Sequence, residues 1–88
     1  MKTSRQLERY FKGASNHHRI DIILLLRKKG AMTLMDIAGT LSCNITTTSE
    51  HTRRLAAAGL VDKSYQGREV YHSLSPYGKK FAVFFKEF

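Results

Sequence analysis

The pattern of apolar and polar positions divides the chain into helical segments and one alternating segment. Apolar side chains recur at the three-and-four spacing of a helix in five stretches, and we predict helices at 4–14, 16–29, 33–42, 44–58 and 76–88. The second stretch is apolar nearly all round, which predicts that it lies at the centre of the fold. Between 61 and 74 the pattern alternates around Gln66-Gly67, and this predicts a β-hairpin.

Local signals at the ends of these stretches support the same division. Asn16 and Asn44 are good N-caps, because an asparagine oxygen accepts from the free N–H groups of a first helical turn. Thr33 with Asp36 three residues later resembles a capping box. Gly59 suits the left-handed conformation that ends a helix. The last helix begins at Ser75-Pro76, with proline at the first helical position.

Two short helices joined by a very short turn, at 33–42 and 44–58, predict a helix-turn-helix. A hairpin directly after it makes this a winged helix. We therefore predict a mostly α fold with a small β-hairpin: one winged helix-turn-helix domain over 1–88, with five helices and a two-stranded wing.

The composition limits the classes of partner and the cellular location that the chain can have. The 88 residues, 42% of them hydrophobic, make one small domain with a formal charge of +8, which favours a polyanionic partner such as nucleic acid. The longest apolar run, Ile22–Leu26, is too short to span a bilayer. The N-terminus lacks the apolar core of a secretory signal, and a single cysteine excludes an internal disulfide framework. We expect a cytoplasmic protein.

The helix at 44–58 separates into two faces. The packed stripe consists of Thr48, His51, Thr52, Leu55 and Ala58. The other face carries short hydroxyls first and arginines later, namely Thr46, Thr47, Ser49, Glu50, Arg53 and Arg54. Hydroxyls near a helix N-terminus suit phosphates and base edges, and arginines suit phosphates or guanine.

The two terminal helices carry matching apolar stripes. Their members are Leu7, Tyr10, Phe11, Phe81, Phe84, Phe85 and Phe88. This much aromatic surface either covers the chain's own core or buries against a second copy, and we predict a homodimer built from the helices at 4–14 and 76–88. A basic amphipathic helix lying on a membrane is the weaker alternative, and no membrane partner is expected.

Several motifs resemble those of the ArsR/MarR-type winged-helix transcriptional regulators. The most specific is the segment Ser49–Val61, in which a serine, a histidine, a leucine and then Ala-Gly-Leu-Val follow the ArsR recognition-helix pattern. Asn16–Ile20 resembles the start of that family's second helix, and Gly67–Leu74 its second wing strand. The segment Leu74–Gly78 is similar to the one after the wing in MarR-like regulators, so the resemblance covers roughly 15–78.

The resemblance implies a dimer that inserts one recognition helix per subunit into successive major grooves of double-stranded DNA. Carried over by position, Thr46, Thr47, Ser49, Glu50 and Arg53 are candidate groove contacts. Asn44, Arg54, Lys63 and Arg68 are candidate backbone or wing contacts. Metal-sensing members carry a cysteine pair on the helix before the recognition helix, and the segment 33–38 has none. We therefore expect no metal and no cofactor, and the sequence identifies no small-molecule effector.

Other function classes remain open. A redox switch at Cys43, in the turn before the recognition helix, is one alternative. A winged helix used as a protein-interaction module is another, because a fold does not fix a function. An enzyme is not expected, since no nucleophile, base and orienting group occur at suitable spacing. The wing tyrosines do not form an RNA-stacking pattern. Our prediction is a DNA-binding transcriptional regulator, acting as a repressor.

Overall fold

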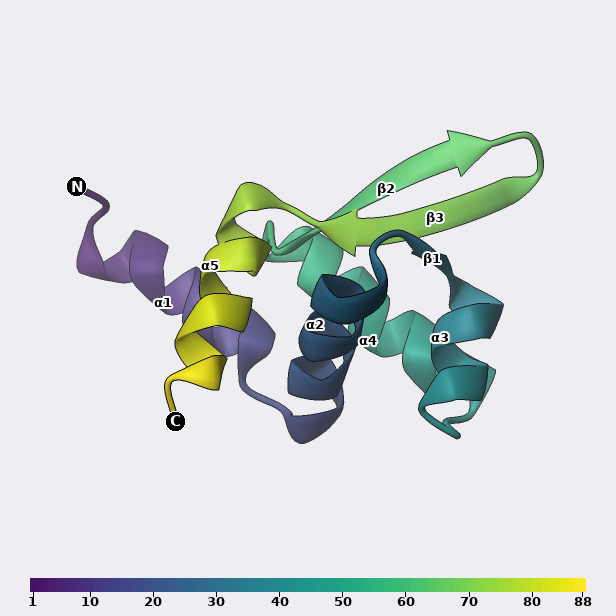
Figure 1. Ribbon diagram of the computed structural model, residues 1–88. Coiled ribbons are helices and arrows are strands. Elements are labelled where there is room, and N and C mark those ends of the chain that lie inside the picture. Colours follow the sequence, from purple (N-terminus) through teal and green to yellow (C-terminus); the bar gives the residue numbers. More distant parts are fainter.

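The computed structural model describes residues 1–88 and contains five helices and one small sheet (Figure 1). The elements, in chain order, are α1 (Ser4–Ala14), α2 (His17–Lys29), β1 (Met32–Thr33), α3 (Leu34–Thr40), α4 (Ile45–Ala57), β2 (Val61–Gln66), β3 (Glu69–Leu74) and α5 (Pro76–Lys86). The five predicted helices and the hairpin are confirmed, and the ends of the helices differ by at most two residues.

The sheet has one strand more than the sequence pattern predicts. Strands β2 and β3 form the antiparallel hairpin, with Val61 opposite Leu74 and Gln66 opposite Glu69. The short strand β1 pairs with the other edge of β3 and places Met32 opposite His72, so the order is β1-β3-β2. This third strand ties the start of α3 to the wing. Two residues are too few to show an alternating pattern, which is why β1 was not predicted.

The predicted caps begin and end the helices. Asn16 Oδ1 accepts from the backbone N–H of His18 at 2.9 Å, and Thr33 Oγ1 accepts from that of Asp36 at 3.2 Å. At the end of α4, Gly59 has a φ of +82°, in the left-handed region that favours glycine. These local interactions fix where each helix starts and stops, and so direct the chain from α4 into the wing.

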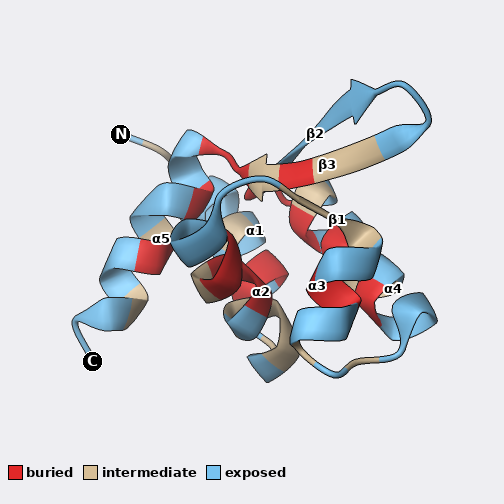
Figure 2. Cartoon of the chain, turned by 45° about the vertical axis from the view of Figure 1, so that its right-hand side comes forward, coloured by how far each residue is buried: buried red, intermediate tan, exposed pale blue.

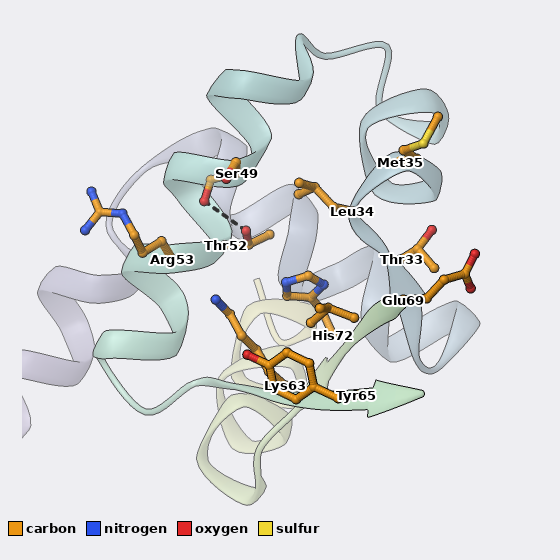
Figure 3. Close-up of a pocket in the computed structure, with 11 residues that line it drawn as sticks. Thr33, Leu34, Met35, Ser49, Thr52, Arg53, Lys63, Tyr65, Glu69 and His72 are labelled. Carbon is orange, nitrogen blue, oxygen red and sulfur yellow. Dashed lines mark hydrogen bonds between the residues drawn. The ribbon is translucent and has the colours of Figure 1, made fainter. Parts of the chain in front are cut away.

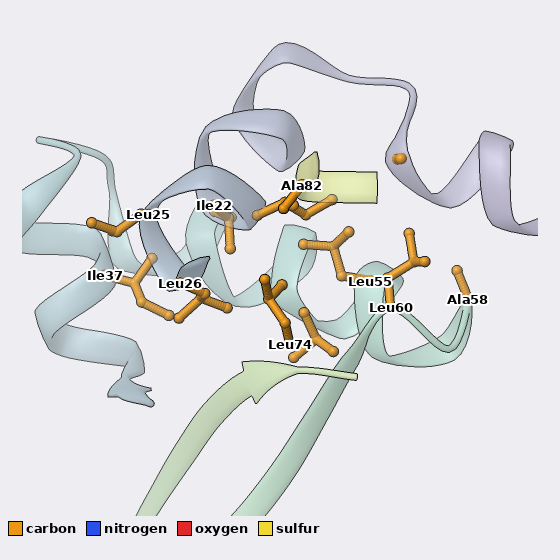
Figure 4. Packing of buried hydrophobic residues seen from close by; sticks show 12 residues of the cluster. Ile22, Leu25, Leu26, Ile37, Leu55, Ala58, Leu60, Leu74 and Ala82 are labelled. Atoms are coloured by element: carbon orange, nitrogen blue, oxygen red, sulfur yellow. The ribbon is translucent and has the colours of Figure 1, made fainter. Parts of the chain in front are cut away.

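The hydrophobic core lies around α2 (Figure 4). This helix contributes Ile22, Ile23, Leu25 and Leu26, which agrees with its prediction as the central helix. The buried side chains of the other elements converge on it, and they include Ile37 of α3, Leu55 of α4, Leu60 just before β2, Leu74 at the end of β3, and Ala82 of α5. Buried positions face inward on every helix, whereas the hairpin projects outward with its tip exposed (Figure 2).

The start of α5 is joined tightly to the segment that follows α4. Ser75 Oγ donates to the carbonyl of Gly59 at 2.6 Å and accepts from the N–H of Gly78 at 3.0 Å. Gly78 is buried against the backbone of Leu60, and a Cβ atom added there would collide with the Leu60 carbonyl oxygen. Only glycine lets the backbones at positions 78 and 60 approach this closely, and the contact fixes α5 relative to the wing.

The terminal helices α1 and α5 pack against each other at the end of the molecule that carries both termini (Figure 1). The rings of Phe11 and Phe81 lie 5.0 Å apart, and those of Tyr10 and Tyr77 lie 4.9 Å apart. Part of the aromatic surface therefore covers the chain's own core. The rest stays in solvent, since the exposed fraction is 52% for Phe11 and 95% for Phe88.

None of the five helices combines the length and the apolar character that crossing a membrane requires.

Candidate nucleic-acid interface

The turn between α3 and α4 sets the direction of α4. Ser42 adopts a positive φ of 53°, and the N–H of Cys43 donates to the carbonyl of Ala38 at 2.9 Å. Asn44 then caps α4, because its Oδ1 accepts from the N–H groups of Thr46 and Thr47 at 2.7 and 3.3 Å. The oxygen of Asn44 is thus occupied by the helix, and only its amide nitrogen is free to donate to a ligand.

The inner face of α4 is held by two buried threonines as well as by Leu55. Thr48 Oγ1 donates to the carbonyl of Asn44 at 2.9 Å, and Thr52 Oγ1 donates to that of Ser49 at 3.0 Å. Both hydroxyls are therefore satisfied within the helix, and the threonine methyl groups pack like those of valine. Burial of polar side chains at these positions does not leave an unpaired donor.

The outer face of α4 borders two hollows. The first, which we call the wing hollow, has a volume of about 390 Å³ and lies between α3, α4 and the sheet (Figure 3). In Figure 3 the Lys63 side chain extends from β2 toward α4, while the guanidinium of Arg53 points away from the hollow. Its lining residues are Thr33, Leu34, Met35, Ser49, Thr52, Arg53, Lys63, Tyr65, Glu69, Val70 and His72.

The second hollow, of about 670 Å³, lies at the start of α4. Its lining residues are Leu34, Ile45, Thr46, Thr47, Ser49, Glu50 and His51. Six of the nine predicted contacts therefore border one hollow or the other, and Ser49 borders both. Asn44, Arg54 and Arg68 line neither; Arg68 instead follows Gly67 at the exposed tip of the hairpin.

One carboxylate pairs with both arginines of α4. Glu50 Oε2 accepts from Arg53 Nη2 at 2.5 Å, and Oε1 accepts from Arg54 Nε at 2.9 Å. Hydrogen bonds from Arg53 first, and then from Arg54, hold the pKa of the Glu50 carboxyl below its usual range. The three groups together carry one positive charge. Lys63 and Arg68 on the wing form no ion pair, so their charges are available to an anionic ligand.

His72 forms the floor of the wing hollow and was not among the predicted site residues. It is 4% exposed, and its Nδ1 atom is buried without a hydrogen-bond partner. Burial lowers the pKa of His72, and the nearby Lys63 charge lowers it further, against a raising contribution from the Met32 backbone. Met35 and Tyr65, both largely exposed, also border the hollow. Only the pairing of β1 with β3 brings these residues together, so no local pattern identifies them.

The single cysteine lies beside an imidazole. Cys43 Sγ is 3.9 Å from His18 Nδ1 and donates to the carbonyl of Leu41 at 3.4 Å. The His18 ring in turn stacks on that of His51, with centroids 5.2 Å apart. No three His, Cys, Asp or Glu side chains gather closely enough to hold a metal ion.

Comparison with known proteins relates this architecture to bacterial regulators. The chain is 32% identical over 63 residues to the cadmium resistance transcriptional regulatory protein CadC of Listeria innocua, an alignment that covers 72% of the chain and 53% of CadC. It thus spans about half the length of this relative. Among solved structures, HlyU from Vibrio cholerae superposes with a TM-score of 0.87 at 21% identity, over 98% of the chain and 94% of HlyU.

A second solved structure is the homodimeric winged helix-turn-helix DNA-binding domain of Mb0332 from Mycobacterium bovis. It has a TM-score of 0.84 at 24% identity and covers 98% of the chain and 85% of that structure. These matches and the order of elements define the chain as a winged helix-turn-helix domain, as predicted. The model of the MarR family matches residues 16–66, more than half of the chain. The chain belongs to the MarR family.

Proposed function

We propose that this chain is a sequence-specific, double-stranded DNA-binding transcriptional regulator. The observation that carries the proposal is the outer face of α4, where hydroxyls and Arg53 border two hollows next to an unpaired lysine on the wing. A helix of this size fits a major groove, where arginine recognises guanine and hydroxyls contact either base edges or phosphates. Membership of the MarR family and the likeness to CadC support this assignment.

In this proposal the two parts of the site have different tasks. Thr46, Thr47, Ser49 and Arg53 contact base edges from α4. Lys63 and Arg68 contact phosphates from the wing, which positions the protein without reading sequence. Asn44, through its free amide nitrogen, and Arg54 contact the backbone beside the groove.

The regulator acts as a homodimer. Leu7, Phe11, Phe84 and Phe88 leave an exposed apolar stripe on α1 and α5, and water-exposed aromatic patches of this kind mark association sites. Tyr10, Phe81 and Phe85 are packed partly against the chain's own core and support the stripe from below. The Mb0332 domain of the same fold is homodimeric. Two-fold symmetry would place one α4 on each half of an inverted repeat.

We infer that it represses transcription by occupying promoter DNA. We propose that it acts in the cytoplasm. We assign it no catalytic activity or cofactor, since its polar groups are arranged for contact with a polyanion rather than around a reacting atom.

This assignment can be tested by NMR, by following the amide chemical shifts of the protein as duplex DNA of random sequence is added. We expect shifts at Thr46–Arg54 and at the wing from Lys63 to Arg68, because these segments face the ligand. The variant Arg53→Ala should weaken binding, whereas Arg9→Ala on α1 removes the same charge from another surface and should have little effect. Shifts spread evenly over all basic segments, with equal losses in both variants, would refute the assignment.

A further inference from the structure

A second group of cations lies away from α4. Arg27, Lys28 and Lys29 occupy the last turn of α2, and Lys79 and Lys86 lie on α5. All five are exposed, and none takes part in any of the three ion pairs of the chain. Their positive charges are therefore not neutralised by the protein itself.

Four of these cations, all except Lys29, border a groove with an apolar floor. One hollow, of about 420 Å³, is bordered by Leu26, Arg27, Lys79 and Val83, among others. The adjoining hollow, of about 520 Å³, is bordered by Arg27, Phe85 and Lys86, among others. Arg27 borders both hollows, which lie between α2 and α5 and meet at this residue, and we call the two together the α2–α5 groove. No acidic side chain borders either hollow.

The helix dipole does not account for all of these charges. Cations in the last turn of α2 complement the negative end of its dipole, and this suffices for Arg27 and its two neighbours. Lys79, in contrast, lies near the N-terminus of α5, where the dipole disfavours a cation. Lys79, across the groove from Arg27, is therefore a cation that the helix dipole does not account for.

The chemistry of the groove selects its ligand. A phosphate backbone presents charge without apolar side chains, so it would leave Val83, which is 48% exposed, and the half-buried Phe85 without an apolar partner from the ligand. An acidic protein segment with one or two large apolar side chains satisfies both parts, because the apolar groups fill the floor and the carboxylates reach the cations. From Lys79 to Lys86 the groove spans about 10 Å along α5, the length of about two helical turns.

We propose that the α2–α5 groove docks an acidic, amphipathic segment of a partner protein. Helix α5, which forms one side of the groove, lies at one end of the molecule, whereas α3 and the wing tip lie at the other end (Figure 1). The groove reaches the base of the wing at Ser73 and Leu74, and a partner bound there leaves the outer face of α4 and the wing tip uncovered. The proposal is independent of DNA binding and holds or fails separately from it.

A synthetic peptide with leucine and glutamate at helical spacing is the probe. Two matched peptides, one with lysine for every glutamate and one with serine for every leucine, separate the contributions of charge and of apolar contact. The protein variants are Arg27→Glu/Lys79→Glu, which reverses charge on both sides of the groove, and Arg5→Glu/Arg9→Glu, which makes the same change in charge on α1. Val83→Ser alters the floor without changing charge, and thermal unfolding verifies that each variant is folded.

We expect the leucine-glutamate peptide to bind with amide shifts confined to Leu24–Gly30, Ser73–Leu74 and Lys79–Lys86. Binding should weaken at least tenfold in Arg27→Glu/Lys79→Glu, severalfold in Val83→Ser, and little in Arg5→Glu/Arg9→Glu. The two control peptides should bind weakly. The proposal would be overturned if the peptide did not bind, or if the two charge-reversed variants lost the same affinity. It would also be overturned if the serine peptide bound as tightly as the leucine peptide, or if duplex DNA shifted the same residues.

Discussion

Arg54 and Glu50 lie one turn apart on α4 and share a hydrogen bond of 2.9 Å between Arg54 Nε and Glu50 Oε1. The other carboxylate oxygen of Glu50 accepts from Arg53, so both arginines of the proposed DNA-binding face are held by one acidic residue. A phosphate or a guanine must compete with Glu50 for each guanidinium.

Glu50→Gln should therefore increase binding to DNA of arbitrary sequence. The amide keeps the shape of the side chain but removes its charge, which frees the arginines for phosphates. We expect an affinity gain of roughly three- to tenfold at low salt and a salt slope steeper by about one, because one more phosphate is neutralised. Titrations at several salt concentrations measure both. Glu8→Gln, which removes the partner of Lys12 on α1, is the control, and an equal gain there would exclude a specific role for Glu50.

Gly78→Ala should destabilise the fold. The added methyl group collides with the Leu60 carbonyl, which itself accepts a hydrogen bond from the Ser75 N–H at 3.1 Å and does not move freely. We expect the free energy of unfolding to fall by about 2 kcal/mol or more.

Gly39→Ala on α3 is the matched substitution, because a Cβ atom there has no neighbour within 4 Å. It should raise the free energy of unfolding by about 0.5–1 kcal/mol through better helix propensity. Denaturant titrations of both variants compare the two values. Equal effects of the two substitutions would contradict the close packing of α5 on the wing segment.

Mild acid should destabilise the protein through His72. Burial lowers its pKa in the folded state, whereas the unfolded chain keeps a value near 6.5. The unfolded state therefore binds more protons as the pH falls below about 6.5, and stability present above that pH is lost progressively down to the folded-state pKa.

His72→Leu should flatten this dependence on pH, as measured by denaturant titrations between neutral and mildly acidic pH. Some dependence should remain, because burial lowers the pKa of His51 as well. His17→Gln removes an exposed imidazole as a control. An unchanged acid response in His72→Leu would show that the buried imidazole is not its source.

The aromatic stripe on α5 should hold the proposed dimer together. Phe84→Glu places a charge in that stripe and should convert the dimer to a monomer, as measured by sedimentation equilibrium. Met35→Glu adds the same charge at another exposed apolar position, on α3, and should leave the dimer intact. If the wild-type chain is a monomer, the proposed dimer does not exist. If Phe84→Glu is still a dimer, the interface lies elsewhere.

Elements set by neighbouring residues could be predicted from the sequence. The Asn44 cap and the Gly59 end of α4 each depend on interactions within a few residues, and the structure contains both. Glu50 and Arg54 are also one turn apart, so an ion pair between them follows from helical spacing alone.

Features that depend on distant pairing could not be predicted. Strand β1 exists because Met32 meets His72, forty positions later in the chain, and this pairing also forms the floor of the wing hollow. The contact of Cys43 with His18 likewise joins the α3–α4 turn to the first turn of α2. No local pattern specifies such contacts, since they depend on how the helices pack.

Sequence-specific DNA binding can be tested by selection from random duplex DNA. Binding of the selected sequence to wild type and to Arg53→Ala is then measured at several salt concentrations. We predict an inverted repeat with half-sites about one helical turn apart, and a relaxed sequence preference in Arg53→Ala. The contrary result is no enriched sequence, with weak binding that disappears at moderate salt in both proteins. The basic surface would then act only as a general polyanion attractor, and the chain would not be a sequence-specific regulator.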